Sequence, residues 1–139
     1  MKTILAAAAL TLGAILPAAA QDFQVPTFTP EEVATASAAI DELGLEDDTY
    51  RDLWCGAAFI FITNFHKSQG NTDAATAAEA NGMTLFARVE TALLPQGLNT
   101  EQLNEIGANS SIVAISQMGA DGGEPAYTEE VCTAAAQAQ

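Results

Sequence analysis

The sequence predicts an all-α single domain, an orthogonal or up-down bundle of four to five helices with one disulfide. The first observation is a densely apolar run at residues 53–65 that is longer than a typical strand and carries helix signals at both ends. The second is that helix-start patterns recur along the chain. The third is that its two cysteines, Cys55 and Cys132, each fall in a segment predicted to be helical.

Residues 1–20 have the features of a secretory signal peptide. Lys2 precedes an apolar segment at residues 4–16, and Pro17 with three alanines follows. Such a pattern predicts cleavage after Ala20 and a periplasmic or secreted protein. What remains is an extended N-terminal arm at residues 21–29 and a helical bundle domain at residues 30–139.

The chain is strongly acidic, with eighteen Asp and Glu residues against four Lys and Arg. Loss of Lys2 with the signal peptide leaves three basic residues against eighteen acids, a net charge of −15. Such a charge repels phosphate backbones and anionic lipid. We therefore expect no nucleic-acid partner and no membrane insertion after signal cleavage.

The arm and the first helix are set by proline and by a capping pattern. Pro26 favours an extended arm, whose apolar side chains we expect to lie on the domain. The segment Thr29-Pro30-Glu31-Glu32 places a capping hydroxyl, a proline and a glutamate where a helix begins. Apolar residues then follow at helical spacing until Gly44, namely Val33, Ala36, Ile40 and Leu43.

The central helix is predicted at residues 48–68. Acids at residues 46–48 suit the positive end of a helix dipole, and His66 and Lys67 suit the negative end. Its apolar residues surround most of the helix, which indicates burial on most sides. The thirteen-residue apolar run is too short to cross a membrane, which needs about 20 residues.

A third helix is expected to start at Asn71 or Thr72 and to end before Pro95 and Gly97. Gly82 lies inside it, where glycine costs about 1 kcal/mol relative to alanine. We interpret this glycine as a point of close contact with a neighbour, either Trp54 or Phe59.

The rest of the chain predicts one or two further helices and then a terminal one. A fourth helical region, residues 100–118, is expected to be capped by Asn99 or Thr100. It forms either one helix or two short ones, because residues 107–109 interrupt the apolar pattern. Residues 121–125 have the composition of a loop. The segment 127–131 repeats the start pattern of residues 28–33 and opens the helix that contains Cys132.

Export and the count of two cysteines predict a structural disulfide between Cys55 and Cys132. The alternatives are an intermolecular bond or a redox thiol, but no C-x-x-C motif occurs. Two helices can bring the Cα atoms within about 4.4–6.8 Å only where side chains are small. We expect Gly56 and Ala135 or Ala136 to supply that space.

Two segments carry a resemblance: Trp-Cys-Gly-Ala-Ala-Phe at residues 54–59 and Tyr-Thr-Glu-Glu-Val-Cys at residues 127–132. Together with the signal peptide they resemble small exported helical proteins of Gram-negative bacteria with one disulfide. More loosely, the chain is similar to periplasmic acid-stress chaperones of enteric bacteria, in which a Trp also stands near the first cysteine. That resemblance implies a holdase that works at low pH.

Groups that would support catalysis or metal binding are scarce. His66 is the only histidine, and Ser110 and Ser111 lie in no nucleophile motif. The loop with Asp121 and Glu124 lacks calcium-binding spacing. We therefore expect no enzyme activity, no metal and no cofactor.

The function predicted from the residues is a non-enzymatic periplasmic binding or interaction module. The central helix carries more large apolar residues than one packing stripe requires. We expect an apolar groove around Trp54, Phe59, Met83 and Met118 that takes an unknown protein or a small apolar ligand. The alternative is an acid-activated chaperone, because the many carboxylates must protonate at low pH.

Overall fold

A computed structural model describes residues 23–119 and 124–138 of the chain. This described part contains helices and no strand. The elements are α1 (Pro30–Asp41), α2 (Asp47–Ser68), α3 (Thr72–Leu93), the 3₁₀ turn η1 (Leu94–Gln96), α4 (Thr100–Met118) and α5 (Glu129–Gln137). The predicted all-α bundle with one disulfide is confirmed. The predicted signal peptide and the start of the arm, residues 21–22, lie outside the described residues.

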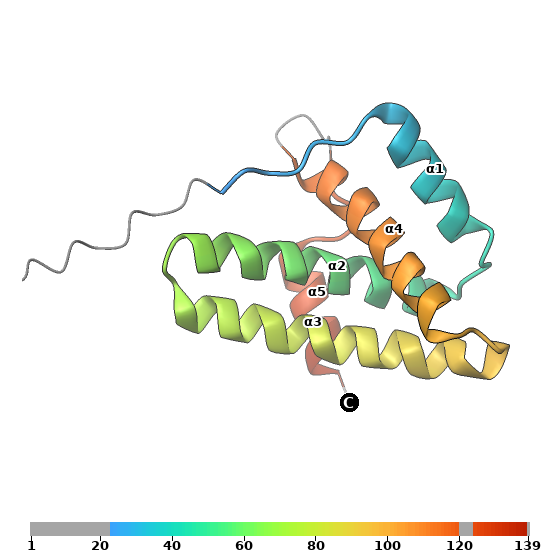
Figure 1. Ribbon diagram of the computed structural model, residues 1–139. Helices are drawn as coiled ribbons and strands as arrows, with labels where there is room; N and C mark the ends of the chain where they lie inside the picture. The colour runs from blue at the N-terminus through green and yellow to red at the C-terminus, as the bar shows by residue number, and fades with distance from the viewer. Residues whose placement is uncertain (1–22, 120–123, 139) are drawn as a thin grey trace, which may run out of the picture.

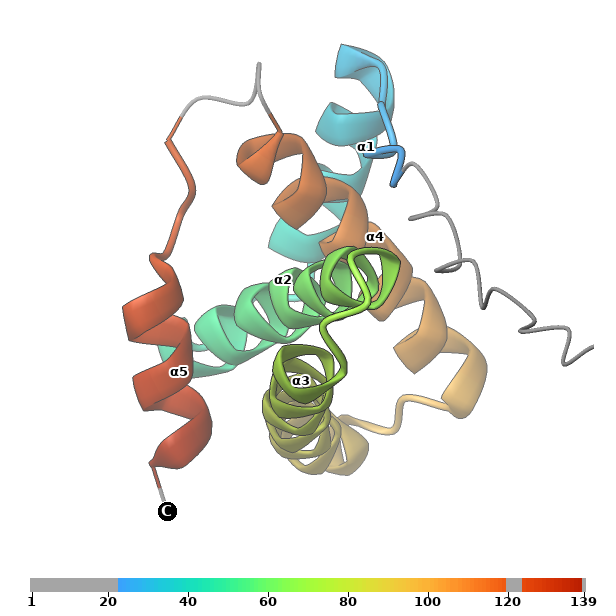
Figure 2. The same cartoon turned by 90° about the vertical axis from the view of Figure 1, so that its left-hand side faces the viewer.

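The bundle is built around a hairpin of two long helices, α2 and α3, which run side by side in opposite directions (Figure 1). Helix α4 lies across α2, and α1 packs on α4. Figure 2 shows α5 on the opposite side of the hairpin from α1 and α4. Helix α2 therefore has neighbours on several sides, whereas α1 contacts the rest of the bundle mainly through α4.

Capping side chains fix where the helices start. Thr29 and Glu32 form a complete capping box at α1, and Asn99 forms one with Gln102 at α4. Asn71 caps α3 and Thr128 caps α5. Of the predicted alternatives, Asn71 and Asn99 are thus the caps, and residues 100–118 form one continuous helix.

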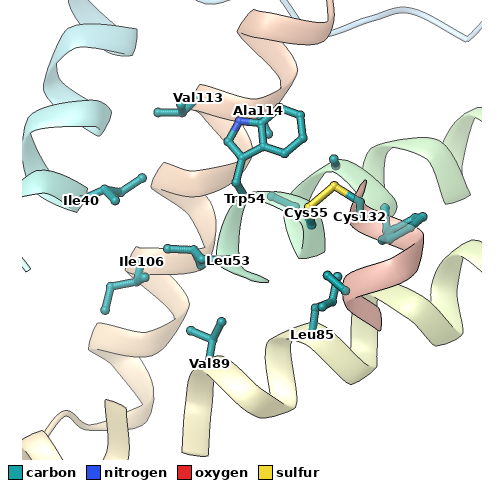
Figure 3. Close-up of a cluster of buried hydrophobic side chains, with 14 of the residues drawn as sticks. Ile40, Leu53, Trp54, Cys55, Leu85, Val89, Ile106, Val113, Ala114 and Cys132 are labelled. Atoms are coloured by element: carbon teal, nitrogen blue, oxygen red, sulfur yellow. A yellow bond between two sulfur atoms is a disulfide. The ribbon is translucent and has the colours of Figure 1, made fainter. Parts of the chain in front are cut away.

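The core surrounds the first part of α2. Every residue from Asp52 to Phe59 is buried, as the apolar pattern predicts. Leu85, Val89 and Leu93 of α3, with Ile106, Val113 and Ala114 of α4, complete this core. Figure 3 shows Leu85 and Val89 of α3, and Ile106, Val113 and Ala114 of α4, around Leu53, Trp54 and the disulfide. The buried segment of α2 is therefore the centre of the fold.

Two glycines allow α2 and α3 to approach closely. A Cβ atom on Gly82 would stand 3.2 Å from Phe59 Cβ, so the predicted contact is with Phe59 rather than Trp54. A Cβ atom on Gly56 would stand 3.1 Å from the Phe86 ring. The prediction that Gly56 makes room for the disulfide is therefore wrong, because Gly56 accommodates Phe86 of α3.

The disulfide joins Cys55 of α2 to Cys132 of α5, as predicted, with the Cα atoms 5.2 Å apart. Both cysteines are buried. Ala135, one helical turn beyond Cys132, is also buried, in line with the small side chains expected there. The bond therefore fixes the terminal helix to the centre of the fold.

The described part of the arm, from Phe23 to Thr29, has no regular secondary structure. The Phe23 ring packs edge-on against Phe61 and Phe65 of α2, with ring centroids 5.3 and 5.8 Å apart. Val25 is exposed. The arm therefore contacts the later part of α2 through one aromatic ring.

Candidate functional site

The structure places the four predicted groove residues in two different environments. Trp54 and Phe59 are core side chains, each 3% exposed, and Met118 packs against the core. The Trp54 indole Nε1 donates a hydrogen bond to Gln117 Oε1 at 2.8 Å. Met83 is 68% exposed on α3. The excess of apolar residues on the first part of α2 is therefore explained by packing against several helices.

Trp54, Phe59 and Met118 do line one common hollow, between α2, the end of α4 and the start of α5. Its volume is about 180 Å³. Tyr127 lies at its edge against the Trp54 ring, and burial raises the pKa of this phenol. Met83 instead lines a hollow of about 220 Å³ with Ile60 and Phe86. Both volumes fall below the roughly 300–1,000 Å³ of typical ligand pockets.

A cavity of about 390 Å³ between α2, α3 and α4 does fall within that range. We call it the α2–α3–α4 cavity. Its apolar lining consists of Leu53, Phe86, Val89, Leu93, Leu103 and Ile106, and its polar lining of Glu90, Thr100 and Asn104, with Gly107 completing the wall. Figure 3 shows Leu53, Val89 and Ile106 on three different helices around this space. An apolar floor with a few polar groups is typical of small-molecule sites.

Two features of α4 leave the cavity open, a glycine in its wall and the turn that precedes the helix. A Cβ atom on Gly107 would meet nothing within 4 Å, so this position of the wall faces open space. The turn between α3 and α4 contains Gly97 at φ 81°, a left-handed conformation that suits glycine. This turn leads α4 away from the end of α3. A sequence pattern cannot reveal the cavity, because it depends on how the two helices diverge.

The lining of the cavity carries negative charge. Glu90 is its only charged lining residue, and this exposed carboxylate has no ion-pair or hydrogen-bond partner among residues 23–119 and 124–138. The basic residues of the described chain that form ion pairs do so elsewhere, Lys67 with Glu79 and the two arginines with acids of α2. The rim therefore has negative charge and hydrogen-bond acceptors.

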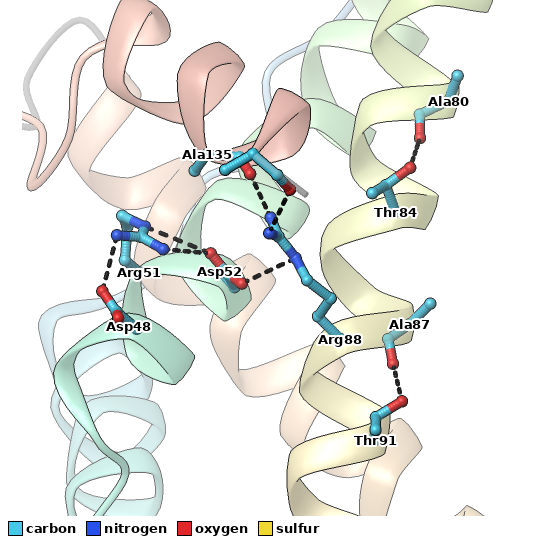
Figure 4. Close-up of polar contacts among 10 residues, drawn as sticks. Asp48, Arg51, Asp52, Ala80, Thr84, Ala87, Arg88, Thr91 and Ala135 are labelled. Carbon is cyan, nitrogen blue, oxygen red and sulfur yellow. Dashed lines mark hydrogen bonds and ion pairs between the residues drawn. The ribbon is translucent and has the colours of Figure 1, made fainter.

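An ion-pair network surrounds the buried Asp52 carboxylate, and no sequence motif predicts it. Asp52 is 6% exposed and lies 3.0 Å from Arg51 Nη2 and 3.2 Å from Arg88 Nε (Figure 4). Arg88 also donates to the carbonyl oxygens of Ala135 and Ala138 at the end of α5. One guanidinium thus joins α2, α3 and α5.

The other polar groups that the sequence singled out have structural partners. The buried Ser110 hydroxyl donates to the Leu53 carbonyl oxygen at 3.1 Å, and Ser111 donates to the carbonyl of Gly107. His66 lies in the last turn of α2 beside the Phe65 ring. Over the described ranges, no three His, Cys, Asp or Glu side chains gather where they could hold a metal ion. Asp121 lies outside these ranges.

None of the described helices has both the length and the apolar character needed to cross a membrane. Comparison of the chain with protein-family models, curated proteins and solved structures gives no match.

Proposed function

We propose that the protein is a non-enzymatic binding module that holds a small apolar ligand in the α2–α3–α4 cavity. The observation that carries this proposal is the lining: six apolar side chains from three helices face a volume of about 390 Å³. Leu53, Val89 and Leu93 on its floor are each at most 4% exposed, so the floor belongs to the core. A ligand there would gain roughly 25 cal/mol for each Å² of apolar surface buried.

We propose further that the protein works in the periplasm or outside the cell. A structural disulfide persists in an oxidising compartment and is rare in the cytosol. The buried Cys55–Cys132 bond supports this location. The signal-peptide pattern of residues 1–20 and the resemblance to small exported proteins of Gram-negative bacteria agree with it.

The test begins with the protein as purified. Denaturing extraction followed by mass spectrometry identifies any small molecule that co-purifies, and native mass spectrometry identifies bound proteins. We expect a small apolar molecule in the extract, or saturable binding of an environment-sensitive apolar fluorophore by the ligand-free protein. Finding neither would contradict the proposal.

A cavity-filling pair of variants locates the site. Gly107→Leu adds a side chain at a lining position where a Cβ atom would meet nothing within 4 Å, whereas Ala108→Leu adds the same side chain at the next, exposed position of α4. We expect Gly107→Leu to weaken fluorophore binding at least about tenfold, since it occupies the apolar volume. Ala108→Leu should bind like the parent. Equal binding by both variants would place the site elsewhere.

A second candidate function, an acid-activated holdase, is favoured by exposed apolar side chains on the later part of α2 in a chain with eighteen Asp and Glu residues. Ile60 and Phe65 already expose apolar surface on α2. Light scattering of an aggregating client protein at low pH tests this function. Unsuppressed aggregation with an unchanged fold would rule it out.

A further inference from the structure

We propose that the ligand of the α2–α3–α4 cavity is a cationic amphiphile, with a protonated amine beside Glu90 and an apolar body on the floor of the cavity. This inference rests on the proposed function, since it specifies the chemistry of that same site. It is carried by the position of one unpaired carboxylate at the rim of an apolar cavity.

The polar lining supplies acceptors for an ammonium group. A primary ammonium has three donors and no acceptor. The side chains of Glu90, Thr100 and Asn104 can each accept a hydrogen bond, and none of them is hydrogen-bonded to another described side chain or backbone group. Because no Lys, Arg or His among the described residues lines the cavity, an anionic head group would find no ion-pair partner there.

One feature favours anions, namely the positive end of the α4 dipole at Thr100. That end amounts to about half an elementary charge. It is already occupied, since Asn99 and Gln102 form a capping box and Glu101 adds a carboxylate in the first turn. The full negative charge of Glu90 therefore decides the sign at the rim.

The apolar floor determines the size and the apolar character of the ligand body. Phe86, Leu103 and Ile106 offer aliphatic and aromatic surface on both long walls. Each methylene that enters such a site improves the dissociation constant about fourfold. A volume of about 390 Å³ is finite, so this gain must stop once the cavity is full. A single short alkyl chain suits it better than a two-tailed lipid.

The experiment compares three probes with one tail, octylamine, octanol and octanoate, by isothermal titration calorimetry at neutral pH and low salt. We expect octylamine to bind roughly fivefold more tightly than octanol, the scale of a partly exposed ion pair, and octanoate to bind most weakly. Added salt should reduce the difference between octylamine and octanol.

Two variants separate a local effect from overall acidity. Glu90→Gln removes the rim carboxylate, and Glu105→Gln removes an exposed carboxylate of α4 that does not line the cavity. We expect Glu90→Gln to abolish the preference for octylamine over octanol while octanol binds as before. Glu105→Gln should keep the preference.

The outcomes distinguish the two proposals. If octanol binds the parent but octanoate binds as tightly as octylamine, or if Glu90→Gln keeps the amine preference, the cation preference is wrong and the apolar site stands. If none of the three probes binds, the proposed function fails, and this inference fails with it.

Discussion

Both halves of α2 carry large apolar side chains, but their surroundings differ. Residues 52–59, the inner half, are all buried, whereas in residues 60–68, the outer half, only Thr63 is buried. Ile60 and Phe65 are 46% and 43% exposed, although they continue the same apolar run. Apolar character alone therefore does not decide burial along this helix.

The difference follows from where the other helices attach. The hydrogen bond from Ser110 to Leu53 fixes α4 to the inner half, and the Cys55–Cys132 bond fixes α5 there as well. The outer half contacts α3, and the Phe23 ring of the arm packs against it. The α2–α3–α4 cavity likewise includes Leu53 of the inner half and no residue of the outer half. We infer that the inner half carries both stability and ligand binding.

The largest effect is expected from separating α5 from the inner half. Replacing Cys55 and Cys132 with Ser opens a cross-link between residues 77 positions apart, a change worth about 4–5 kcal/mol in the chain-entropy model. We expect the midpoint of thermal unfolding to fall by more than about 10 °C. Calorimetry of the double variant checks this. A double variant as stable as the parent would contradict it, as would two free thiols in the unfolded, unreduced parent.

A matched pair of phenylalanines compares the halves directly. Phe59→Ala empties a site that is 3% exposed and should cost about 3–5 kcal/mol of unfolding free energy. Phe65→Ala removes the same side chain from a site that is 43% exposed and packed mainly on Phe23, and should cost about 1 kcal/mol. Urea denaturation measures both. Equal losses would mean that the outer half is covered in solution.

A third comparison uses one ion pair from each half. Arg88→Met leaves the buried Asp52 with Arg51 as its remaining cation and frees the end of α5, so we expect a loss of about 2 kcal/mol. Lys67→Met breaks a pair with Glu79 whose side chains are both about half exposed, and should cost less than about 1 kcal/mol. Similar losses from the two substitutions would show that the buried network has no special role.

The smallest effect is expected at a surface group away from α2. The backbone N–H and hydroxyl of Thr29 donate to Glu32 and lower the pKa of its carboxyl from the usual 4.5. The Glu32 carboxylate therefore stabilises the folded protein above about pH 4.5, and this stabilisation is lost as pH falls through the lower folded-state pKa of Glu32. Glu32→Gln should reduce the midpoint of thermal unfolding slightly at neutral pH and not at low pH.

The neighbouring substitution Glu31→Gln is the control, because Glu31 takes no part in the capping box. If Glu32→Gln and Glu31→Gln followed the same pH dependence, the capping contact would not be its source.

The sequence predicted the helices well because their ends are local. The start of α1 is set by Thr29 with Pro30 and Glu32, the start of α2 carries acids in its first turn, and Gly97 follows the end of α3. Each of these residues acts within a few positions of a helix end. The disulfide was predictable for a different reason, since two cysteines allow one intramolecular pairing. These features need no knowledge of how the helices pack.

The candidate site was not predictable in the same way. Trp54 and Met83 look alike as large apolar residues, but Trp54 of α2 is in the core and Met83 of α3 is 68% exposed. The α2–α3–α4 cavity is lined by Leu53 of α2 and by Gly107 of α4, where a Cβ atom would meet nothing within 4 Å. The Asp52–Arg88 pair joins residues far apart in sequence. Each depends on tertiary placement.

Hydrogen exchange along α2, with and without octylamine, tests most directly whether the inner half carries both stability and binding. We predict that the amides of residues 52–59 exchange only through global unfolding, while those of residues 60–68 exchange through local opening. The ligand should further slow exchange near Leu53 and residues 103–107. Uniform protection along α2, or slowing centred on Ile60 and Lys67, would contradict the account.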